Sequence, residues 1–438
     1  MAVDAQARGR WALLVAVAMV TVLAGCWFQP GGAPGNTRFN GIDGGLTTAN
    51  VASLHEAWSV DVAGGGTGAT TEPIVSGNRV YVTHTKWAAI DVIETLAVEA
   101  RDIGTGDLVW QTSLVPPGYA DWAQATQVTL IDGALWVATQ TLGTPTCTST
   151  LTRLDPATGA VLTEETTDGF GSYPVGDGGI VAHAGCLDTM ARSLVVRDAA
   201  TRAVVWTATF PALAPVSEPT IADGRIYVVA GASLYAFAAQ GCGGASTCAP
   251  LWQADGATGR PVAGPGGRVL VLHDEAGNGA EVFVASVRAY DGATGDLLWQ
   301  TATGDPTRST AIDGIAVGGD RVYVPVIHDP WGAPGPSTEL AVYPASGCGA
   351  STCDPSWTAS LGPGAAFRPT VGGGVAYVTL HVDGGRSSAV VAAPAAGCGG
   401  PTCTELVRRT RPGWMTSPSL AAGRLFVSAE SDLVAFAP

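Results

Sequence analysis

Short apolar runs separated by turn residues recur along the whole chain, and they predict β-strands rather than helices. One kind of run follows a glycine, as in 77–82 and 224–228. A second kind ends beyond an Asp-x-x-Thr-Gly turn, as in 100–110 and 289–299. Apolar runs of this length, bounded by turn signals, are typical of half-buried strands. Each repeat therefore predicts four short strands, A to D, with tight turns between A and B and between C and D.

The last strand of this repeat recurs eight times along the chain. Its members share a Trp, or an aliphatic residue in its place, at positions Trp58, Trp110, Leu162, Trp206, Trp252, Trp299, Trp357 and Val407. Their spacing of 44 to 58 residues is typical of propeller blades. The chain ends on a C strand and begins with an unpartnered D strand at 53–58. We therefore predict an all-β fold: an eight-bladed β-propeller of four-stranded blades over residues 41–438, closed by pairing the N-terminal strand with the C-terminal blade.

The first residues predict export. Arg8 and Arg10 precede an apolar run at 11–23, which at 13 residues is short of the roughly 20 needed to span a bilayer. The run closes on Leu-Ala-Gly-Cys, which resembles a lipobox. Residues 1–25 therefore predict a lipoprotein signal peptide, with Cys26 acylated by diacylglycerol and fatty acid such as palmitate and inserted in the lipid bilayer. Residues 26–40 are rich in Gly and Pro and predict a flexible tether.

The remaining eight cysteines predict four disulfides in an oxidising compartment. Three couples lie close in sequence in copies of one phrase, and the fourth pair follows by elimination. The predicted pairs are Cys242–Cys248, Cys348–Cys353, Cys398–Cys403 and Cys147–Cys186. Zinc is disfavoured because the couples fall on different blades and cannot share an ion.

The formal net charge of −15 excludes nucleic acid as a partner, since phosphate binding requires clustered Lys and Arg and the chain has no basic run. The 59 glycines and 13% of charged residues agree with an all-β chain of short buried strands and many turns.

The repeated phrase Ala-x-Asp-x-x-Thr-Gly-x-x-x-Trp, together with the opening at 46–58, resembles the repeat of PQQ-type propellers. That superfamily includes quinoprotein alcohol dehydrogenases and BamB-like outer-membrane assembly lipoproteins. The resemblance implies that Trp, turn Gly and Ala lock neighbouring blades together, so that the Trp series is structural. It covers about residues 41–438.

A PQQ-dependent dehydrogenase is the alternative that the resemblance raises. Such enzymes hold PQQ and Ca²⁺ on the propeller axis over a disulfide of two adjacent cysteines. This chain has no adjacent cysteine pair and no C-x-x-C-H haem motif. We therefore expect no cofactor, and PQQ in particular is disfavoured.

The candidate binding face is the one that carries the B–C and D–A loops, because six B–C connections are long and long loops on a rigid scaffold usually carry function. Histidines end several B strands there, some with acidic neighbours, and aromatic residues lie in the same loops. The candidates are His84, Tyr119, Trp122, His273, Asp274, His328, Asp329, Trp331, His381 and Asp383. Such a set suits a metal, a general base, a sugar or a peptide, or else it is the polar end of strands that meet solvent.

The sequence thus predicts a monomeric, membrane-anchored, non-catalytic binding or scaffold propeller. Its partner on the loop face is an envelope protein, a glycan or a small ligand, and a metal or glycan site remains an alternative. It would lie on the outer face of the plasma membrane in a Gram-positive cell, or in the periplasm or outer membrane of a Gram-negative one.

Overall fold

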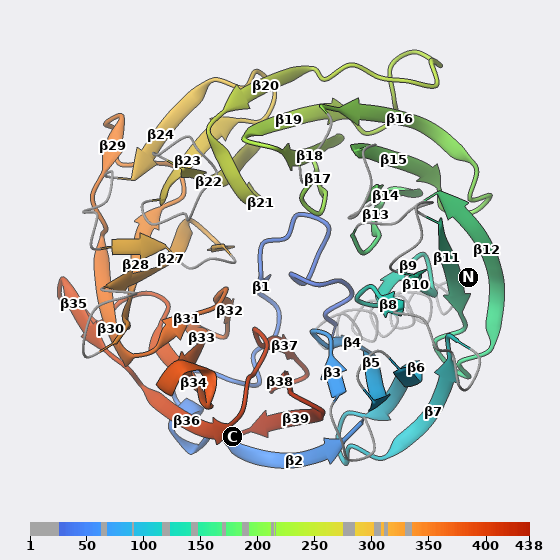
Figure 1. Ribbon diagram of the computed structural model, residues 1–438. Coiled ribbons are helices and arrows are strands. Elements are labelled where there is room, and N and C mark those ends of the chain that lie inside the picture. The colour runs from blue at the N-terminus through green and yellow to red at the C-terminus, as the bar shows by residue number, and fades with distance from the viewer. Residues whose placement is uncertain are drawn as a thin grey trace, which may run out of the picture.

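The computed structural model describes most of the chain after the leader. The described residues are 26–62, 68–89, 92–115, 123–141, 148–168, 172–185, 192–211, 214, 216–274, 285–301, 308–310, 314–328 and 335–438. They form eight sheets arranged as blades around one axis (Figure 1). The predicted all-β, eight-bladed propeller is therefore confirmed. Within the described part of the chain, no helix has the length and apolarity that a membrane crossing requires.

Blades 1 to 4 follow one another along the chain, each with its first strand nearest the axis. Blade 1 contains β3 (Gly68–Thr70), β4 (Ile74–Ser76), β5 (Arg79–Ala89), β6 (Val92–Asp102) and β7 (Leu108–Ser113). Blade 2 contains β8 (Ala123–Ala125), β9 (Thr129–Ile131), β10 (Ala134–Thr141), β11 (Thr148–Leu154) and β12 (Val161–Asp168). Blade 3 contains β13 (Val175–Asp177), β14 (Ile180–Ala184), β15 (Arg192–Asp198) and β16 (Val204–Phe210). Blade 4 contains β17 (Thr220–Ala222), β18 (Arg225–Ala230), β19 (Ser233–Ala238) and β20 (Trp252–Asp255).

Blades 5 to 8 repeat the plan. Blade 5 contains β21 (Ala257–Gly264), β22 (Arg268–Asp274), β23 (Ala285–Asp291) and β24 (Leu297–Thr301). Blade 6 contains β25 (Arg308–Thr310), β26 (Ala316–Gly318), β27 (Arg321–His328), β28 (Ser337–Pro344) and β30 (Trp357–Pro363). Blade 7 contains β31 (Ala365–Ala366), β32 (Thr370–Gly372), β33 (Val375–Val382), the short 3-10 helix η2 (Asp383–Gly385), β34 (Ser387–Pro394) and β36 (Val407–Pro412). Blade 8 contains β37 (Ser419–Ala421), β38 (Arg424–Ala429) and β39 (Asp432–Ala437).

Blade 8 takes its outer strand from the other end of the chain. Strand β2 (His55–Asp61), which follows the 3-10 turn η1 (Val51–Ser53), pairs antiparallel with β39. Arg411 in blade 7 strengthens this seam through ion pairs with Glu56 on β2 and with Asp432 on β39. The ring closes as predicted, because β2 pairs with the edge of β39 that would otherwise lie open at the end of the chain.

A tryptophan in the outer strand of one blade packs on a turn glycine of the next blade. A Cβ on Gly106 would lie 2.9 Å from the Trp58 ring, and one on Gly295 would lie 2.7 Å from the Trp252 ring. The same indoles donate Nε1 to carbonyls of the next blade, Trp58 to Ile103 at 3.1 Å and Trp252 to Gly292 at 3.0 Å. The Trp series therefore locks blades together, as the resemblance implied.

The three predicted short-range disulfides are present, Cys242–Cys248, Cys348–Cys353 and Cys398–Cys403. Two of their loops add a parallel strand to the outer strand of the preceding blade, β29 (Thr352–Cys353) on β24 and β35 (Thr402–Thr404) on β30. The third makes the parallel bridge Thr207–Thr247. These loops therefore cover strand edges and are more than stapled turns. Cys147 and Cys186 lie outside the described residues.

Residues 27–40 do not form the flexible tether that their Gly and Pro content predicted. They wind around the axis and bond to the first strand of every blade, where Trp27 and Arg38 are almost fully buried. The blade residues that they contact are Val75, Leu130, Gly176, Ile221, Ala263, Val317, Val371 and Leu420. Part of the segment, β1 (Phe39–Asn40), pairs parallel with β32. Glycine and proline serve here as tight-turn residues in a buried path.

The axial segment, as we call residues 27–40, closes one end of the propeller axis. Its contacts fall on the first strands just before the A–B turns, as for Val75 ahead of Gly77 and Val371 ahead of Gly373. The side with the A–B and C–D turns is called the turn face below, and the side with the B–C and D–A loops is the loop face. The axial segment lies toward the turn face.

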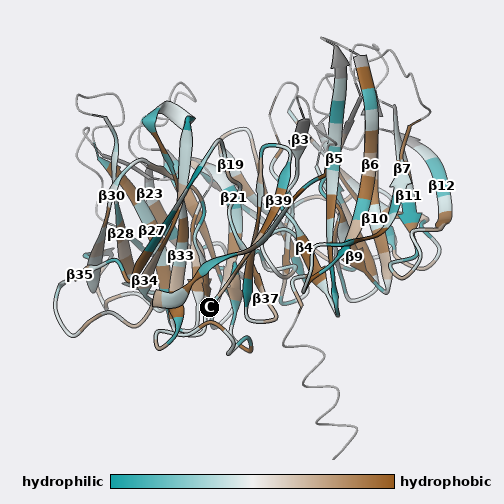
Figure 2. Ribbon diagram, turned by 90° about the horizontal axis from the view of Figure 1, so that it is seen from below, coloured by the Kyte–Doolittle hydropathy of each residue, from teal (hydrophilic) through white to brown (hydrophobic). Residues whose placement is uncertain are grey.

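The long B–C connection predicted at 84–99 is largely regular structure. Strands β5 and β6 continue through it to Ala89 and from Val92, so that blade 1 carries an extended hairpin. This hairpin projects beyond the other blades in the side view (Figure 2). The prediction of a loop was wrong because residues beyond the blade core can still pair as two strands.

Candidate functional site

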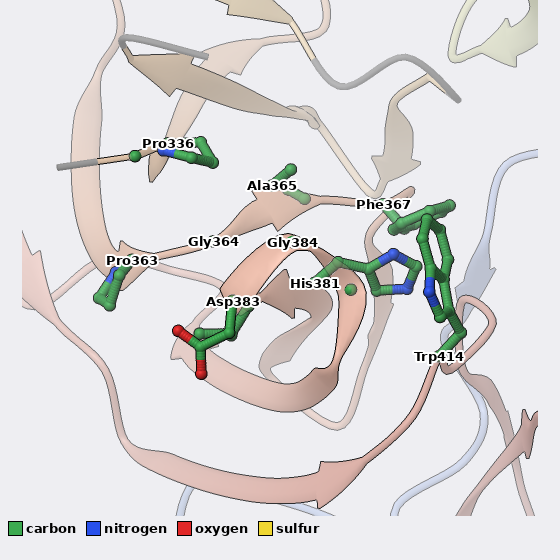
Figure 3. A pocket seen from close by; sticks show the side chains of 13 residues that line it. Pro336, Pro363, Gly364, Ala365, Phe367, His381, Asp383, Gly384 and Trp414 are labelled. Carbon is green, nitrogen blue, oxygen red and sulfur yellow. The ribbon is translucent and has the colours of Figure 1, made fainter. Parts of the chain in front are cut away.

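A pocket of about 470 Å³ opens on the loop face between blades 6, 7 and 8 (Figure 3). It is built from four segments that meet there: the residues that lead into β28, the D–A connection into blade 7, the B–C turn of blade 7, and the D–A connection into blade 8. Its lining residues are Gly335, Pro336, Pro363–Phe367, His381–Gly385 and Trp414. The predicted residues His381 and Asp383 are thus brought together in one concave site.

Three rings form one wall of the pocket. The His381 ring lies 4.1 Å from the centre of Phe367 and 4.0 Å from that of Trp414, and the indole stands edge-on to both (Figure 3). Trp414 keeps 53% of its surface exposed, whereas His381 keeps only 7%. The buried imidazole therefore supports the indole, and the indole presents an aromatic face to solvent.

The His381 imidazole is fixed in one tautomer. Its Nε2 lies 3.0 Å from the Met415 carbonyl oxygen, which can only accept a hydrogen bond, so Nε2 carries a proton and donates it. The imidazole is thereby held across the D–A connection into blade 8. This hydrogen bond positions the imidazole as part of the pocket wall.

The turn that carries Asp383 packs against the Trp414 indole. Asp383, Gly384 and Gly385 all have positive φ, at 52°, 67° and 88°. A Cβ on Gly385 would meet the Trp414 ring at 2.5 Å, so only glycine fits beneath the indole. The left-handed conformation of Asp383 is uncommon for a residue with a side chain, and such positions gather at ligand sites.

The other predicted histidines do not join this pocket. His84 and His183 are buried within blades 1 and 3, and burial lowers their pKa to about 4 and about 3. His273 lies against Gly256, which connects blades 4 and 5, and His328 is the half-buried last residue of β27. Strand B is the second strand from the axis, and the histidines near its end in blades 1, 3, 5 and 7 are buried instead of facing solvent.

No metal centre is found where the structure gives side chains: no three of its His, Cys, Asp and Glu residues stand close enough to hold an ion. Tyr119, Trp122, Asp329 and Trp331 lie outside the described residues, as does the side chain of Asp274.

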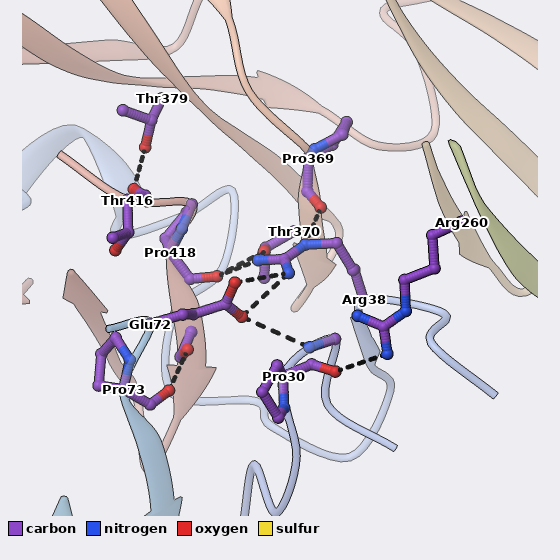
Figure 4. Close-up of polar contacts among 12 residues, drawn as sticks. Pro30, Arg38, Glu72, Pro73, Arg260, Pro369, Thr370, Thr379, Thr416 and Pro418 are labelled. Carbon is purple, nitrogen blue, oxygen red and sulfur yellow. Dashed lines mark hydrogen bonds and ion pairs between the residues drawn. The ribbon is translucent and has the colours of Figure 1, made fainter. Parts of the chain in front are cut away.

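A second polar centre lies at the axis, around Arg38 of the axial segment (Figure 4). Arg38, which is fully buried, donates Nη1 to both carboxylate oxygens of Glu72 in blade 1, at 3.0 and 3.1 Å. It also donates Nε to the Pro369 carbonyl in blade 7 at 2.8 Å and Nη2 to the Pro418 carbonyl in blade 8 at 2.9 Å. One guanidinium therefore joins three blades.

The residues of the axis do not fit Ca²⁺-bound PQQ. Calcium requires six to eight oxygen ligands with carboxylates among them, whereas the axis presents guanidinium groups and the carboxylate of Glu72 is already paired with Arg38. The three described cystines join residues five or six apart on the peripheral C–D turns, so none supplies a vicinal disulfide.

Comparison with known proteins finds others with a similar architecture. A family model described as outer membrane protein assembly factor BamB matches residues 147–353. No curated protein sequence matches significantly. Among solved structures, the chain is similar to a europium-containing methanol dehydrogenase (14% identity over 94% of this chain and 90% of that one, TM-score 0.60). It is also similar to BamB from Moraxella catarrhalis (13%, 88% and 98%, TM-score 0.55) and to a quinohemoprotein alcohol dehydrogenase from Pseudomonas putida HK5 (13%, 96% and 81%, TM-score 0.60). Sequence identities this low show a shared fold alone. The similar structures include both enzymes and BamB.

The sequence analysis did not identify Phe367, nor Arg260 and Arg368, which lie at the start of the first strands of blades 5 and 7. A signal for the arginines was present: a residue directly before proline recurs at the start of several A strands, as in Glu72-Pro73 and Arg368-Pro369. What the sequence could not show is that these residues point to one axis, because that depends on closure of the ring.

Proposed function

Because the chain is a PQQ-like β-propeller, we propose that it is a non-catalytic binding propeller that works outside the cytoplasm, with the loop-face pocket as its binding site. The observation that carries this proposal is the pocket around Trp414. An indole that is 53% exposed, backed by a buried imidazole and a glycine that fits beneath it, is an aromatic surface held in place for contact.

The ligand that suits this pocket is a peptide segment with an apolar side chain next to a basic one. Phe367, Trp414 and the prolines Pro336 and Pro363 supply the apolar walls, while Asp383 supplies a carboxylate at the rim (Figure 3). A chain with a net charge of −15 attracts a basic segment at long range. We propose that another envelope protein supplies this segment.

Export and anchoring complete the proposal. The three cystines fit an oxidising compartment. Cys26 directly precedes Trp27, which is bonded to Val75 on the turn-face half of blade 1. If Cys26 carries lipid, no tether separates the propeller from the bilayer, so the turn face lies against the membrane and the loop-face pocket opens away from it.

A peptide array tests the proposed site. Wild-type protein would be applied to an array of random nonapeptides, with Trp414→Ala as the pocket variant and Leu251→Ala as the matched control. Leu251 is equally exposed, at 55%, but lies in the C–D connection of blade 4 on the turn face. We expect peptides with an apolar–basic core to bind wild type and L251A and to lose at least about tenfold in affinity with W414A.

Two results would overturn the proposal. One is a set of peptides that bind W414A as well as wild type. The other is dehydrogenase turnover with an alcohol substrate after addition of PQQ and Ca²⁺, which would favour the enzymatic alternative.

A further inference from the structure

One position recurs at the start of the first strand of every blade. It lies three residues before the residue that contacts the axial segment, and therefore on the loop-face side of that segment. We call the eight residues at this position the axial ring. They are Glu72, Gln127, Tyr173, Glu218, Arg260, Gly314, Arg368 and Ser417.

Contacts across blades show that ring members point to the axis. The Arg260 guanidinium of blade 5 lies 4.9 Å from the ring centre of Tyr173 in blade 3, reaching past blade 4. It also donates Nη2 to the Pro30 carbonyl of the axial segment at 3.4 Å (Figure 4). Only side chains that converge on the centre of the propeller can meet in this way.

Ring members carry several buried polar atoms that have no hydrogen-bond partner among the described residues. These atoms are Gln127 Oε1, Tyr173 Oη, Arg260 Nε, Arg260 Nη1 and Arg368 Nε. Arg260 is only 5% exposed and forms no ion pair with any described carboxylate. Burial, and next the positive charge of Arg368, holds the pKa of Arg260 well below its usual range. A buried cation left without a counter-ion is costly, so its retention needs a reason.

The charge balance at the axis is positive even though the chain is acidic. Arg38 and Glu72 pair through two hydrogen bonds. The remaining charged members of the axial ring are Arg260, Arg368 and Glu218, so one positive charge is in excess, and neither arginine forms an ion pair with a described carboxylate. Gly314 of blade 6 lies between these two arginines in the ring and places no side chain between them. A Cβ there would only touch Arg368, at 3.8 Å.

We propose that the axial ring binds a small oxyanion between Arg260 and Arg368, over Gly314, with the Tyr173 hydroxyl as an additional donor. The planar guanidinium groups offer paired N–H donors that match carboxylate or phosphate oxygens. The axial segment closes the turn-face end of the axis, so the anion enters from the loop face. This site shares no residue with the Trp414 pocket, so the two proposals are tested separately.

Calorimetric titration with trisodium citrate and with sodium phosphate, at matched ionic strength, tests the site and separates the two anion classes. The variants are Arg260→Gln and Arg368→Gln. Arg321→Gln is the control, because Arg321 is an exposed arginine that pairs with Asp320 beside the A–B turn of blade 6. We expect one saturable site in wild type and R321Q, and at least a tenfold loss of affinity in R260Q and R368Q. The anion that binds more tightly identifies the class.

Thermal unfolding distinguishes an anion site from a structural arginine. Without anion, R260Q should melt no lower than wild type, because the substitution removes an uncompensated buried charge. The stabilisation that the anion gives wild type should be absent in R260Q and R368Q. The proposal fails if neither anion saturates, if both variants bind as wild type does, or if R260Q is destabilised in the absence of anion.

Discussion

Arg38 donates two hydrogen bonds to the Glu72 carboxylate at 3.0 and 3.1 Å, and this buried pair joins the axial segment to blade 1 beside the closing seam of the propeller. The same guanidinium bonds to carbonyls of blades 7 and 8, so it spans the point where the first and last blades meet. The N-terminal segment is thus an integral part of the closed ring.

Breaking this pair should be strongly destabilising. Arg38→Met or Glu72→Gln leaves one buried charge without its partner, which typically costs about 3–5 kcal/mol. Denaturant unfolding should show this loss for both variants. The exposed pair of Arg321 and Asp320 is the control, and R321Q should change stability by less than about 1 kcal/mol. Equal effects at both sites would show that the axial pair is unimportant.

Removal of the axial segment should loosen all eight first strands at once. A chain that begins at Gly41 leaves the amides of Leu130, Ile221 and Val317 without their carbonyl acceptors on the segment. We expect a lower melting temperature and faster hydrogen exchange at all three of these amides, which lie in blades 2, 4 and 6. Faster exchange confined to blades 1 and 8 would mean that the segment acts only at the seam.

The Trp–Gly contacts between blades can be tested with two glycines of equal φ. Gly106 and Gly133 both have φ of 77°, but only at Gly106 does a Cβ meet a ring, that of Trp58 at 2.9 Å. Gly133→Ala should therefore cost about 1–2 kcal/mol from backbone strain alone. Gly106→Ala should cost about 1–3 kcal/mol more, because the indole must move. Similar losses in denaturant unfolding would argue against the blade lock.

Stability should fall as the pH drops below about 6.5. The pKa of His84 is lowered to about 4 and that of His183 to about 3, mainly by burial. The unfolded chain therefore takes up these protons first, and the stability present above pH ~6.5 is lost as the pH falls toward 4 and then 3. Each histidine contributes at most about 1.4 kcal/mol per pH unit.

The double variant His84→Gln/His183→Gln should flatten this dependence. Free energies of unfolding measured between pH 7 and pH 4.5 give the slope. The exposed His55 on β2 is the control, and H55Q should leave the slope unchanged. A double variant with the wild-type slope would assign the dependence to other groups.

The cystine loops should protect the strand edges that they cover. Cys398→Ser/Cys403→Ser removes a short loop closure worth about 2 kcal/mol. It should also speed hydrogen exchange at Thr358, whose amide donates to the Pro401 carbonyl of that loop at 2.9 Å. Exchange at Cys248, in the equivalent loop of blade 4, should not change. Unchanged protection at Thr358 would show that the loop holds its place without the disulfide.

Much of the fold could be predicted because each blade carries a copy of one sequence repeat. The Trp series from Trp58 to Trp357 set the blade count, and the unpartnered strands at both ends predicted closure. The axial segment was mispredicted because Gly and Pro suit a flexible tether and a buried turn equally well, and only packing decides between them. The histidines at the ends of the B strands were located correctly along the chain, but their burial depends on how blades contact one another.

Hydrogen exchange across residues 27–40 in the full chain tests most directly the claim that this segment is built into the propeller and closes its turn-face end. Trp27 and Arg38 are buried, and the Trp27 amide donates to Val75 at 2.7 Å. We predict that the Trp27 and Arg38 amides exchange as slowly as those of core strands such as β38. Exchange as fast as that of the exposed C–D turn glycines, such as Gly349, would contradict the account and restore a flexible tether.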